Sequence, residues 1–310
     1  MSRAFVFPGQ GAQAVGMGRA LAEAYPAARE VFEEVDAALG EALSRLIWEG
    51  EAETLTLTRN AQPALMATSI AALRALESEG IGVGSAAFVA GHSLGEYSAL
   101  CAAGAIGLAD TARLLRLRGE AMQAAVPVGV GAMAALLGLD FAAVDAVARE
   151  AAQGEVCQAA NDNDPAQVVI SGHTAAVERA VEIAKSRGAK RAILLPVSAP
   201  FHCALMRPAA EAMRAALEGV TILPPAVPVV ANVAAEAVGD PEAIRRLLVE
   251  QVTGSVRWRE SVLWMAGRGV REFWEVGAGK ALSGMIRRIA PETATRAVGT
   301  PEDVAAAAAG

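Results

Sequence analysis

Residues 86–103 read AAFVAGHSLGEYSALCAA, and this stretch decides the fold. Its first five residues, 86–90, are continuously apolar and predict a short buried strand, and a helix is expected from Glu96 to Ala103. The intervening GHSLG at 91–95 matches G-x-S-x-G, the tight strand-to-helix turn that presents a serine. Only glycine leaves room at the two flanking positions of such a turn. The stretch therefore predicts a parallel sheet buried under helices, with Ser93 exposed at the end of one strand.

Similar strand and helix units flank this stretch. Residues 4–7 predict a first strand that stops at Pro8, and residues 63–79 predict a helix with Pro63 in its first turn. A helix is expected at 108–124 and further strands at 227–231 and 270–276, with helices at 205–217, 241–251, 258–268 and 281–289. The Ala-rich end of the chain, VAAAAAG, is expected to be frayed.

Residues 131–197 show a separate pattern of expected strands and helices. Strands are expected at 131–139, 156–160, 167–171 and 189–197, with helices to 152 and 187 that Asp140 and Thr174 cap. Residues 161–165, NDNDP, predict a turn. The resulting βαββαβ order is typical of a ferredoxin-like unit. We therefore expect a small domain at 128–198, inserted into a discontinuous large domain formed by 1–127 and 199–310.

Composition limits the function classes. The chain has 310 residues, of which 54% are hydrophobic and 20% charged, so a large core is expected and disorder is not. The net charge of −7 argues against nucleic acid or an anionic membrane as the main partner. The 3 Cys residues, 101, 157 and 203, are too widely spaced for a disulfide framework or a metal site. With no signal peptide and no apolar run that could span a bilayer, a cytoplasmic protein is expected.

A serine nucleophile requires a base, and the chain has only 3 His residues. His92 adjoins Ser93 and points elsewhere, and His173 is expected to top a helix of the small unit. His202 follows the last strand of that unit, where the chain re-enters the large one, so elimination favours it as the base. The group that orients His202 stays open, because the candidate aspartates between residues 93 and 202, namely Asp140, Asp145, Asp162 and Asp164, all fall within the small unit.

Two further features allow more than one interpretation. Arg116 and Arg118 stand two apart on a mostly apolar helix, so one of them faces inward. An inward arginine serves either a structural ion pair or a substrate anion. Residues 9–14, GQGAQA, match a weak dinucleotide pattern, and the alternative is a glycine loop whose N–H groups face an anionic centre. Cys203 is better explained as a small apolar residue than as a thiol nucleophile.

Several motifs in fixed order carry a family resemblance. They are FVFPGQG at 5–11, GHSLGEY at 91–97, RLRG at 116–119 with Met122, NDN at 161–163 before QVVISG, VSAPFH at 197–202, QVT at 251–253 before VRW, and EVG at 275–277. Together they closely resemble the malonyl-CoA:acyl-carrier-protein transacylase family of type II fatty-acid synthesis. The resemblance covers essentially the whole chain.

The resemblance implies an α/β-hydrolase-like large domain with the ferredoxin-like small domain inserted. It implies that Ser93 attacks a malonyl thioester and that His202 is its base, oriented by a backbone carbonyl near Gln251. Arg118 would pair with the free malonyl carboxylate. The N–H groups of Gln10 and Leu94 would form the oxyanion hole.

The resemblance also implies the surroundings and the partners. The side chains expected around the substrate are His92, Met122, Phe201, Asn161, Asn163 and Gln251. Phe201 resembles the malonyl-selective form of its motif and would crowd an α-methyl group. The expected reaction is ping-pong, from malonyl-CoA to the phosphopantetheine thiol of an acyl carrier protein, and it needs no cofactor or metal.

Docking and assembly are less constrained. An acidic carrier requires a local basic face on this acidic chain, and the candidates are Lys190, Arg191, Lys280, Arg287 and Arg288, which are equally well explained as ordinary solvated charges. A monomer is expected, although no sequence feature decides the oligomeric state. The alternatives are a stand-alone acyltransferase for polyketide synthesis, an esterase or thioesterase, and a non-catalytic carrier-binding subunit.

Overall fold

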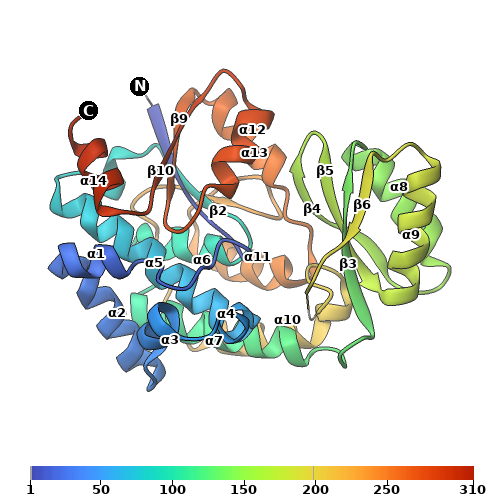
Figure 1. Ribbon diagram of the computed structural model, residues 1–310, viewed down its shortest axis with the longest axis horizontal. Coiled ribbons are helices and arrows are strands. Elements are labelled where there is room, and N and C mark those ends of the chain that lie inside the picture. Colours follow the sequence, from blue (N-terminus) through green and yellow to red (C-terminus); the bar gives the residue numbers. More distant parts are fainter. Residues whose placement is uncertain (1, 198) are drawn as a thin grey trace.

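The computed structural model describes residues 2–197 and 199–310 and shows two lobes, each built around its own sheet (Figure 1). The large lobe holds a six-stranded sheet in the order β10-β9-β1-β2-β7-β8. Its strands are β10 (Ala294–Val298), β9 (Val270–Val276), β1 (Ser2–Phe7), β2 (Phe88–Gly91), β7 (Val229–Ala231) and β8 (Glu236–Val238). All neighbours pair in parallel except β7 and β8. The predicted mixed α/β architecture with a parallel core is confirmed.

Helices cover both faces of this sheet, and strand alternation explains why. Along β1, Phe5 and Phe7 enter the larger core, whereas Ala4 and Val6 enter a smaller one on the opposite face. The smaller core is closed by α12 (Trp258–Gly267) and α13 (Ala281–Ile289). The larger core packs against α2 (Pro26–Leu39), α5 (Thr58–Ser78), α6 (Leu94–Ala102), α7 (Leu108–Ala124), α10 (Arg207–Glu218), α11 (Pro241–Thr253) and α14 (Pro301–Ala308). The short helices α1 (Arg19–Ala24), α3 (Leu43–Glu49) and α4 (Ala52–Thr56) lie before α5 in the chain.

The small lobe is a four-stranded antiparallel sheet in the order β4-β5-β3-β6. Its elements in chain order are β3 (Gly131–Leu137), α8 (Phe141–Ala152), β4 (Cys157–Asp164), β5 (Gln167–His173), α9 (Thr174–Ser186) and β6 (Arg191–Leu194). The two helices share a separate apolar core with the sheet. Asp140 caps α8 by accepting a hydrogen bond from the Ala143 N–H, as predicted. The end of the predicted small domain, residue 198, lies outside the described residues.

The sequence prediction placed Pro63 at the start of a helix, and this is wrong. The helix α5 begins at Thr58, so Pro63 lies inside it. A proline there leaves the carbonyl of Arg59 without its usual helical donor. The Arg116 guanidinium donates to that carbonyl instead, at 2.6 Å, and so makes the interior proline tolerable.

The predicted turn at 161–165 is also wrong, because β4 continues through Asp164. The polar residues that mimic a turn are satisfied by the large lobe. Asp162 pairs with Arg259 at 2.9 Å, and Asp164 pairs with Arg288 at 2.7 Å. Asn161 forms a parallel bridge with Val256. These three contacts of β4, which we call the latch, join the small lobe to the large one.

The predicted cap of one helix and the predicted fraying of the chain's end are both wrong. Thr174 does not cap α9: its hydroxyl donates to the Gly129 carbonyl, and His173 occupies the cap position. The tail is not frayed, because Thr300 and Asp303 form a capping box that starts α14. The strands β8 and β10 were not predicted.

Candidate active site

Ser93 stands on a sharp turn between β2 and α6 with a positive φ of 53°, which is strained for a residue with a side chain. A Cβ on Gly91 would lie 1.9 Å from the Gly95 carbonyl oxygen, and one on Gly95 would lie 2.2 Å from the Phe7 carbonyl oxygen. Both glycines are therefore sterically required, as predicted. The Ser93 N–H donates to Asn232 Oδ1 at 2.8 Å, which helps to hold the strained turn.

His202 is the histidine that meets the serine. Its Nε2 lies 2.8 Å from Ser93 Oγ, and its Nδ1 lies 2.9 Å from the carbonyl oxygen of Gln251. A carbonyl only accepts, so Nδ1 carries the proton and Nε2 is free to take one from the Ser93 hydroxyl. Burial, and secondly the charge of Arg118, lowers the pKa of His202 to about 3, so the ring is neutral at neutral pH. The pairing chosen by elimination is present.

Arg118 is the inward-facing arginine of α7, only 1% exposed. Its Nη2 donates to Ser93 Oγ at 3.1 Å and to Gln251 Oε1 at 2.8 Å. Its Nη1 donates to Gln62 Oε1 at 2.7 Å, whereas Nε has no partner among the described residues. Arg116 points away and pairs with Glu41, so the two arginines do occupy different faces. A buried guanidinium beside a nucleophile is able to bind an anionic group at one end of a short acyl chain while the nucleophile bonds to the other end.

A chain of polar side chains leads from Arg118 across α5, and sequence reasoning missed it. Gln62 donates to Thr58 Oγ1 at 2.9 Å, and Thr58 donates to Gln10 Oε1 at 2.9 Å. Gln62 also contacts Met122 Sδ at 3.7 Å. Met122, predicted to lie around the substrate, therefore shares this partner with Arg118. The signal in the sequence was two uncharged polar residues four apart on an apolar helix.

The N–H groups of Gln10 and Leu94 were predicted to form an oxyanion hole. Leu94 opens α6 directly after Ser93, and the loop of Gln10 packs against the same turn, since a Cβ on Gly9 would lie 2.7 Å from the His92 carbonyl oxygen. Within residues 2–197 and 199–310, no acceptor pairs with either N–H. Two free donors beside the nucleophile have the chemistry that a developing oxyanion requires.

His92, Asn163, Asn161 and Phe201 lie where the two lobes meet. His92 Nε2 lies 2.9 Å from Asn163 Oδ1, its ring centroid lies 5.9 Å from that of Trp258, and burial lowers its pKa. Asn161 belongs to the latch of β4, and Phe201 is buried immediately before His202. His92 therefore ties the turn to the small lobe and does not meet the Ser93 hydroxyl.

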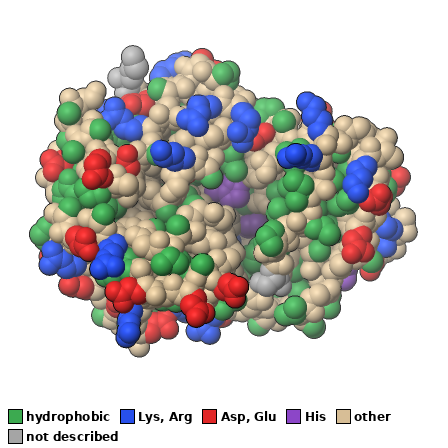
Figure 2. All heavy atoms as spheres, in the orientation of Figure 1, with side chains coloured by type: hydrophobic (Ala, Val, Ile, Leu, Met, Phe, Trp, Pro, Cys, Tyr) green, Lys and Arg blue, Asp and Glu red, His purple; other side chains and the backbone are tan. Residues whose placement is uncertain are grey.

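Figure 2 shows histidine side chains at the bottom of a hollow between the lobes, with lysine and arginine side chains gathered along its upper rim. The five predicted docking residues are all exposed. Arg288 is engaged by Asp164, and Arg287 donates to Thr295 Oγ1 at 3.1 Å. Among the described residues, Lys190, Arg191 and Lys280 have no ion-pair partner.

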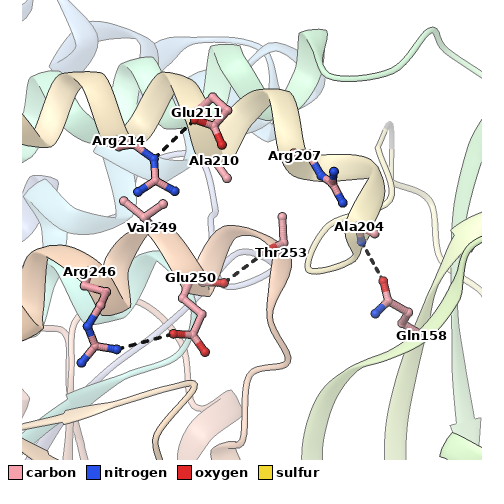
Figure 3. A pocket seen from close by; sticks show the side chains of 10 residues that line it. All are labelled: Gln158, Ala204, Arg207, Ala210, Glu211, Arg214, Arg246, Val249, Glu250 and Thr253. Carbon is pink, nitrogen blue, oxygen red and sulfur yellow. Dashed lines mark hydrogen bonds and ion pairs between the residues drawn. The ribbon is translucent and has the colours of Figure 1, made fainter.

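A separate cavity of about 570 Å³ opens between α10 and α11. Figure 3 shows that two of its arginines, Arg214 and Arg246, face Glu211 and Glu250. The reacting trio of Ser93, His202 and Arg118 is absent from its lining. The cavity is therefore separate from the reacting groups. In the described part of the chain, no cluster of His, Cys, Asp or Glu could hold a metal ion, and no helix is long and apolar enough to cross a membrane.

Residues 4–294 match the acyl transferase domain family. The malonyl CoA-acyl carrier protein transacylase of Escherichia coli strain K12 is 49% identical over 305 residues, which is 98% of each chain. The enzyme of the same name from Bacillus subtilis strain 168 is 49% identical over 302 residues, covering 97% of this chain and 94% of the relative. This chain belongs to the malonyl CoA-acyl carrier protein transacylase family.

Solved structures of the family agree with this assignment. The acyl-carrier-protein S-malonyltransferase of Bartonella henselae superposes with a TM-score of 0.97 at 58% identity, covering 99% of this chain and 98% of that one. A malonyl-transacylase in complex with a type II PKS acyl-carrier protein superposes with a TM-score of 0.96 at 43% identity, covering 100% of this chain and 99% of that one.

Proposed function

We propose that this chain transfers a malonyl group from malonyl-CoA to the phosphopantetheine thiol of an acyl carrier protein, through a malonyl ester on Ser93. The observation that carries the proposal is the buried Arg118 guanidinium 3.1 Å from the Ser93 hydroxyl. A simple acyl group has no use for a buried cation there. A malonyl group bound to Ser93 places its free carboxylate within reach of it.

In the acylation step, Ser93 Oγ attacks the thioester carbonyl carbon while its proton passes to His202 Nε2. The carbonyl oxygen becomes an oxyanion that the N–H groups of Gln10 and Leu94 stabilise. The carbon–sulfur bond then breaks, and the CoA sulfur takes the proton from His202. The thiol of the carrier reverses these steps, giving its proton to His202 and receiving the malonyl group from Ser93.

The charge of Arg118 links substrate binding to the base. In the free enzyme this charge is the second cause of the low His202 pKa. When a malonyl carboxylate pairs with Arg118, that charge is neutralised and the pKa of His202 rises. The base therefore becomes stronger when the correct acyl group is bound.

Specificity and partners follow the same geometry. We expect the ring of Phe201, directly before His202, to crowd an α-methyl group, so methylmalonyl is expected to be a poor substrate. Lys190, Arg191 and Lys280 are exposed charges able to attract an acidic carrier, and Arg287 and Arg288 are partly committed elsewhere. The reaction needs no cofactor or metal, because the prosthetic thiol belongs to the carrier.

We further propose that residues 128–198 form an inserted ferredoxin-like domain and that the large lobe is α/β-hydrolase-like. The β4-β5-β3-β6 order of the small sheet and its separate core support the division. The three cysteines are free and buried, which suits a reducing cytoplasm. A monomer remains our expectation.

The carrier belongs either to fatty-acid synthesis, as the family resemblance implies, or to polyketide synthesis. The second candidate is favoured by one observation, the likeness to the transacylase solved with a type II PKS acyl-carrier protein. The reaction at Ser93 is the same for both. Transfer rates to one carrier of each kind distinguish them.

Mass spectrometry of the intact protein mixed with malonyl-CoA tests the proposal. We expect a malonyl adduct that is absent in Ser93→Ala and that a carrier thiol discharges faster than water does. Rapid hydrolysis without any dependence on the carrier would indicate an esterase or thioesterase instead. Retention of the biological role in Ser93→Ala would indicate a non-catalytic carrier-binding subunit.

A further inference from the structure

Glu96 is a buried carboxylate that no step of the proposed reaction uses. It lies in the first turn of α6, three residues after Ser93, and is 2% exposed. Its Oε2 accepts a hydrogen bond from the Asn232 N–H at 2.9 Å and another from Gln251 Nε2 at 2.8 Å. A buried acid is costly unless its partners compensate for the lost water, so its retention beside the nucleophile calls for a reason.

The two partners of Glu96 touch every reacting group. Asn232 Oδ1 accepts from the Ser93 N–H at 2.8 Å, and its Nδ2 donates to the Gly91 carbonyl at 2.7 Å. Asn232 therefore holds the strained turn at its first residue, Gly91, and at Ser93.

Gln251 makes the remaining connections. Its backbone carbonyl accepts from His202 Nδ1 at 2.9 Å, its Oε1 accepts from Arg118 Nη2 at 2.8 Å, and its Nε2 donates to the Ser93 carbonyl at 3.0 Å. One carboxylate oxygen thus lies a single residue away from the nucleophile, the base and the arginine.

The hydrogen-bonding roles allow only one arrangement. Glu96 Oε2 and the Ser93 carbonyl both accept, so the NH₂ group of Gln251 must face them. Its oxygen is then left to face the guanidinium of Arg118. Without an acceptor at residue 96, the amide loses its shorter acceptor at 2.8 Å and is held by the Ser93 carbonyl at 3.0 Å and by Arg118, so its position is less firmly fixed.

We propose that Glu96 is a positioning residue for acyl transfer, which holds Ser93, His202 and Arg118 in register through Asn232 and Gln251. It acts by the geometry of its accepting oxygen and not by its negative charge. The inference rests on the proposed function.

The pKa of Glu96 supports the geometric role. Burial raises it to about 7, against the opposing hydrogen bonds and the charge of Arg118. At neutral pH the carboxyl is therefore partly protonated, and its Oε2 is able to accept both bonds in either state.

Two substitutions separate geometry from charge. Glu96→Gln removes the charge but keeps an oxygen in the same place, because both partners are donors and fix the new amide with its oxygen toward them. Glu96→Asp keeps the charge, but its shorter side chain does not reach both partners. A geometric role predicts that the neutral variant outperforms the acidic one, and a role based on charge predicts the reverse.

Glu275 is a matched control, since it is 0% exposed and its oxygens accept from the N–H groups of Leu282 at 3.0 Å and Ser283 at 2.7 Å. Glu275→Asp shortens a buried acid of β9 in the same way, and its partners are at the start of α13, outside the site. We expect it to lower the melting temperature and to leave the acylation rate constant unchanged.

The experiment is single-turnover acylation by malonyl-CoA, with rate constant and half-saturation concentration measured separately and folding checked by thermal melting. We expect Glu96→Gln to stay within about fivefold of wild type. Glu96→Asp should lose on the order of 10²-fold in the saturating rate constant, as for an ångström-scale misplacement of reacting groups.

Four results would overturn the inference: Glu96→Asp equal to or faster than Glu96→Gln, a loss confined to half-saturation, an equal loss in Glu275→Asp, or a hundredfold loss in folded Glu96→Gln. The last result decides the matter even where Glu96→Asp does not fold. A wild-type protein that takes no malonyl group refutes the proposed function instead, so the two failures are distinguishable.

Discussion

Replacing Arg118 with methionine removes the guanidinium while keeping an unbranched apolar side chain of similar length. In the proposed function, a malonyl carboxylate would take two charge-assisted hydrogen bonds from Arg118, each worth about 1.5–3 kcal/mol. An acetyl group has no carboxylate, and loses only the indirect contribution of the bond from Nη2 to Ser93 Oγ, about 1 kcal/mol. The substitution should therefore affect the two acyl groups very differently.

The difference amounts to at least about 3 kcal/mol, which corresponds to roughly a hundredfold change in relative rate at 1.4 kcal/mol per factor of ten. We expect Arg118→Met to slow acylation by malonyl-CoA by on the order of 10²-fold or more, and acylation by acetyl-CoA by less than about tenfold. The assay is quenched-flow mass spectrometry of the adduct on Ser93 with each thioester.

Arg116→Met is the matched control, because Arg116 lies on the same helix and serves Glu41 and the Arg59 carbonyl. It should cost stability without changing the preference between malonyl and acetyl. Equal slowing of both thioesters by Arg118→Met would refute the reasoning, since it would mean that Arg118 only maintains the structure through Gln62 and Gln251.

Three further outcomes are expected. Gly95→Ala should destabilise the fold by about 3 kcal/mol or more in a denaturant titration, because its Cβ would lie 2.2 Å from a carbonyl oxygen, whereas Gly107→Ala, with nothing within 4 Å, should stay within about 1 kcal/mol of wild type. Because burial lowers the His202 pKa to about 3, the base stays neutral as pH falls, and kcat/KM should show no His202 limb between pH 8 and 5; a limb near the usual 6.5 would contradict this. Asn232→Ala leaves the Ser93 N–H without its 2.8 Å acceptor and should lower stability by about 1–3 kcal/mol and acylation by more than tenfold; a variant as fast as wild type would show that Asn232 does not hold the turn.

The parts of the site that the sequence predicted are those set by local constraints. Ser93 was recognisable because its turn needs two glycines, a strand before it and a helix after it. His202 was found because only three histidines were available. The face of Arg118 was not decidable from periodicity, since two arginines two apart are equivalent until the neighbouring helices are placed.

The parts that were missed depend on pairing between distant segments. Gln62, Asn232 and the contact role of Glu96 gain their meaning only when α5, β7 and α6 meet. Residues 161–164 have the composition of a turn, and they remain in a strand because arginines more than 90 positions later neutralise their acids. The final helix was missed although the sequence carries a signal for it. Thr300 and Asp303 form a capping box, but the alanine-rich tail after them suggested a frayed end.

The orientation of His202 by a main-chain carbonyl has a consequence for how this site can change. A point mutation can replace the side chain at residue 251, but every amino acid keeps the carbonyl that accepts from His202 Nδ1. The oriented base is thus protected from single substitutions at that position. The side chain of the same residue bonds Arg118, the Ser93 carbonyl and Glu96, so a substitution there disturbs these contacts while the acceptor for His202 Nδ1 is kept.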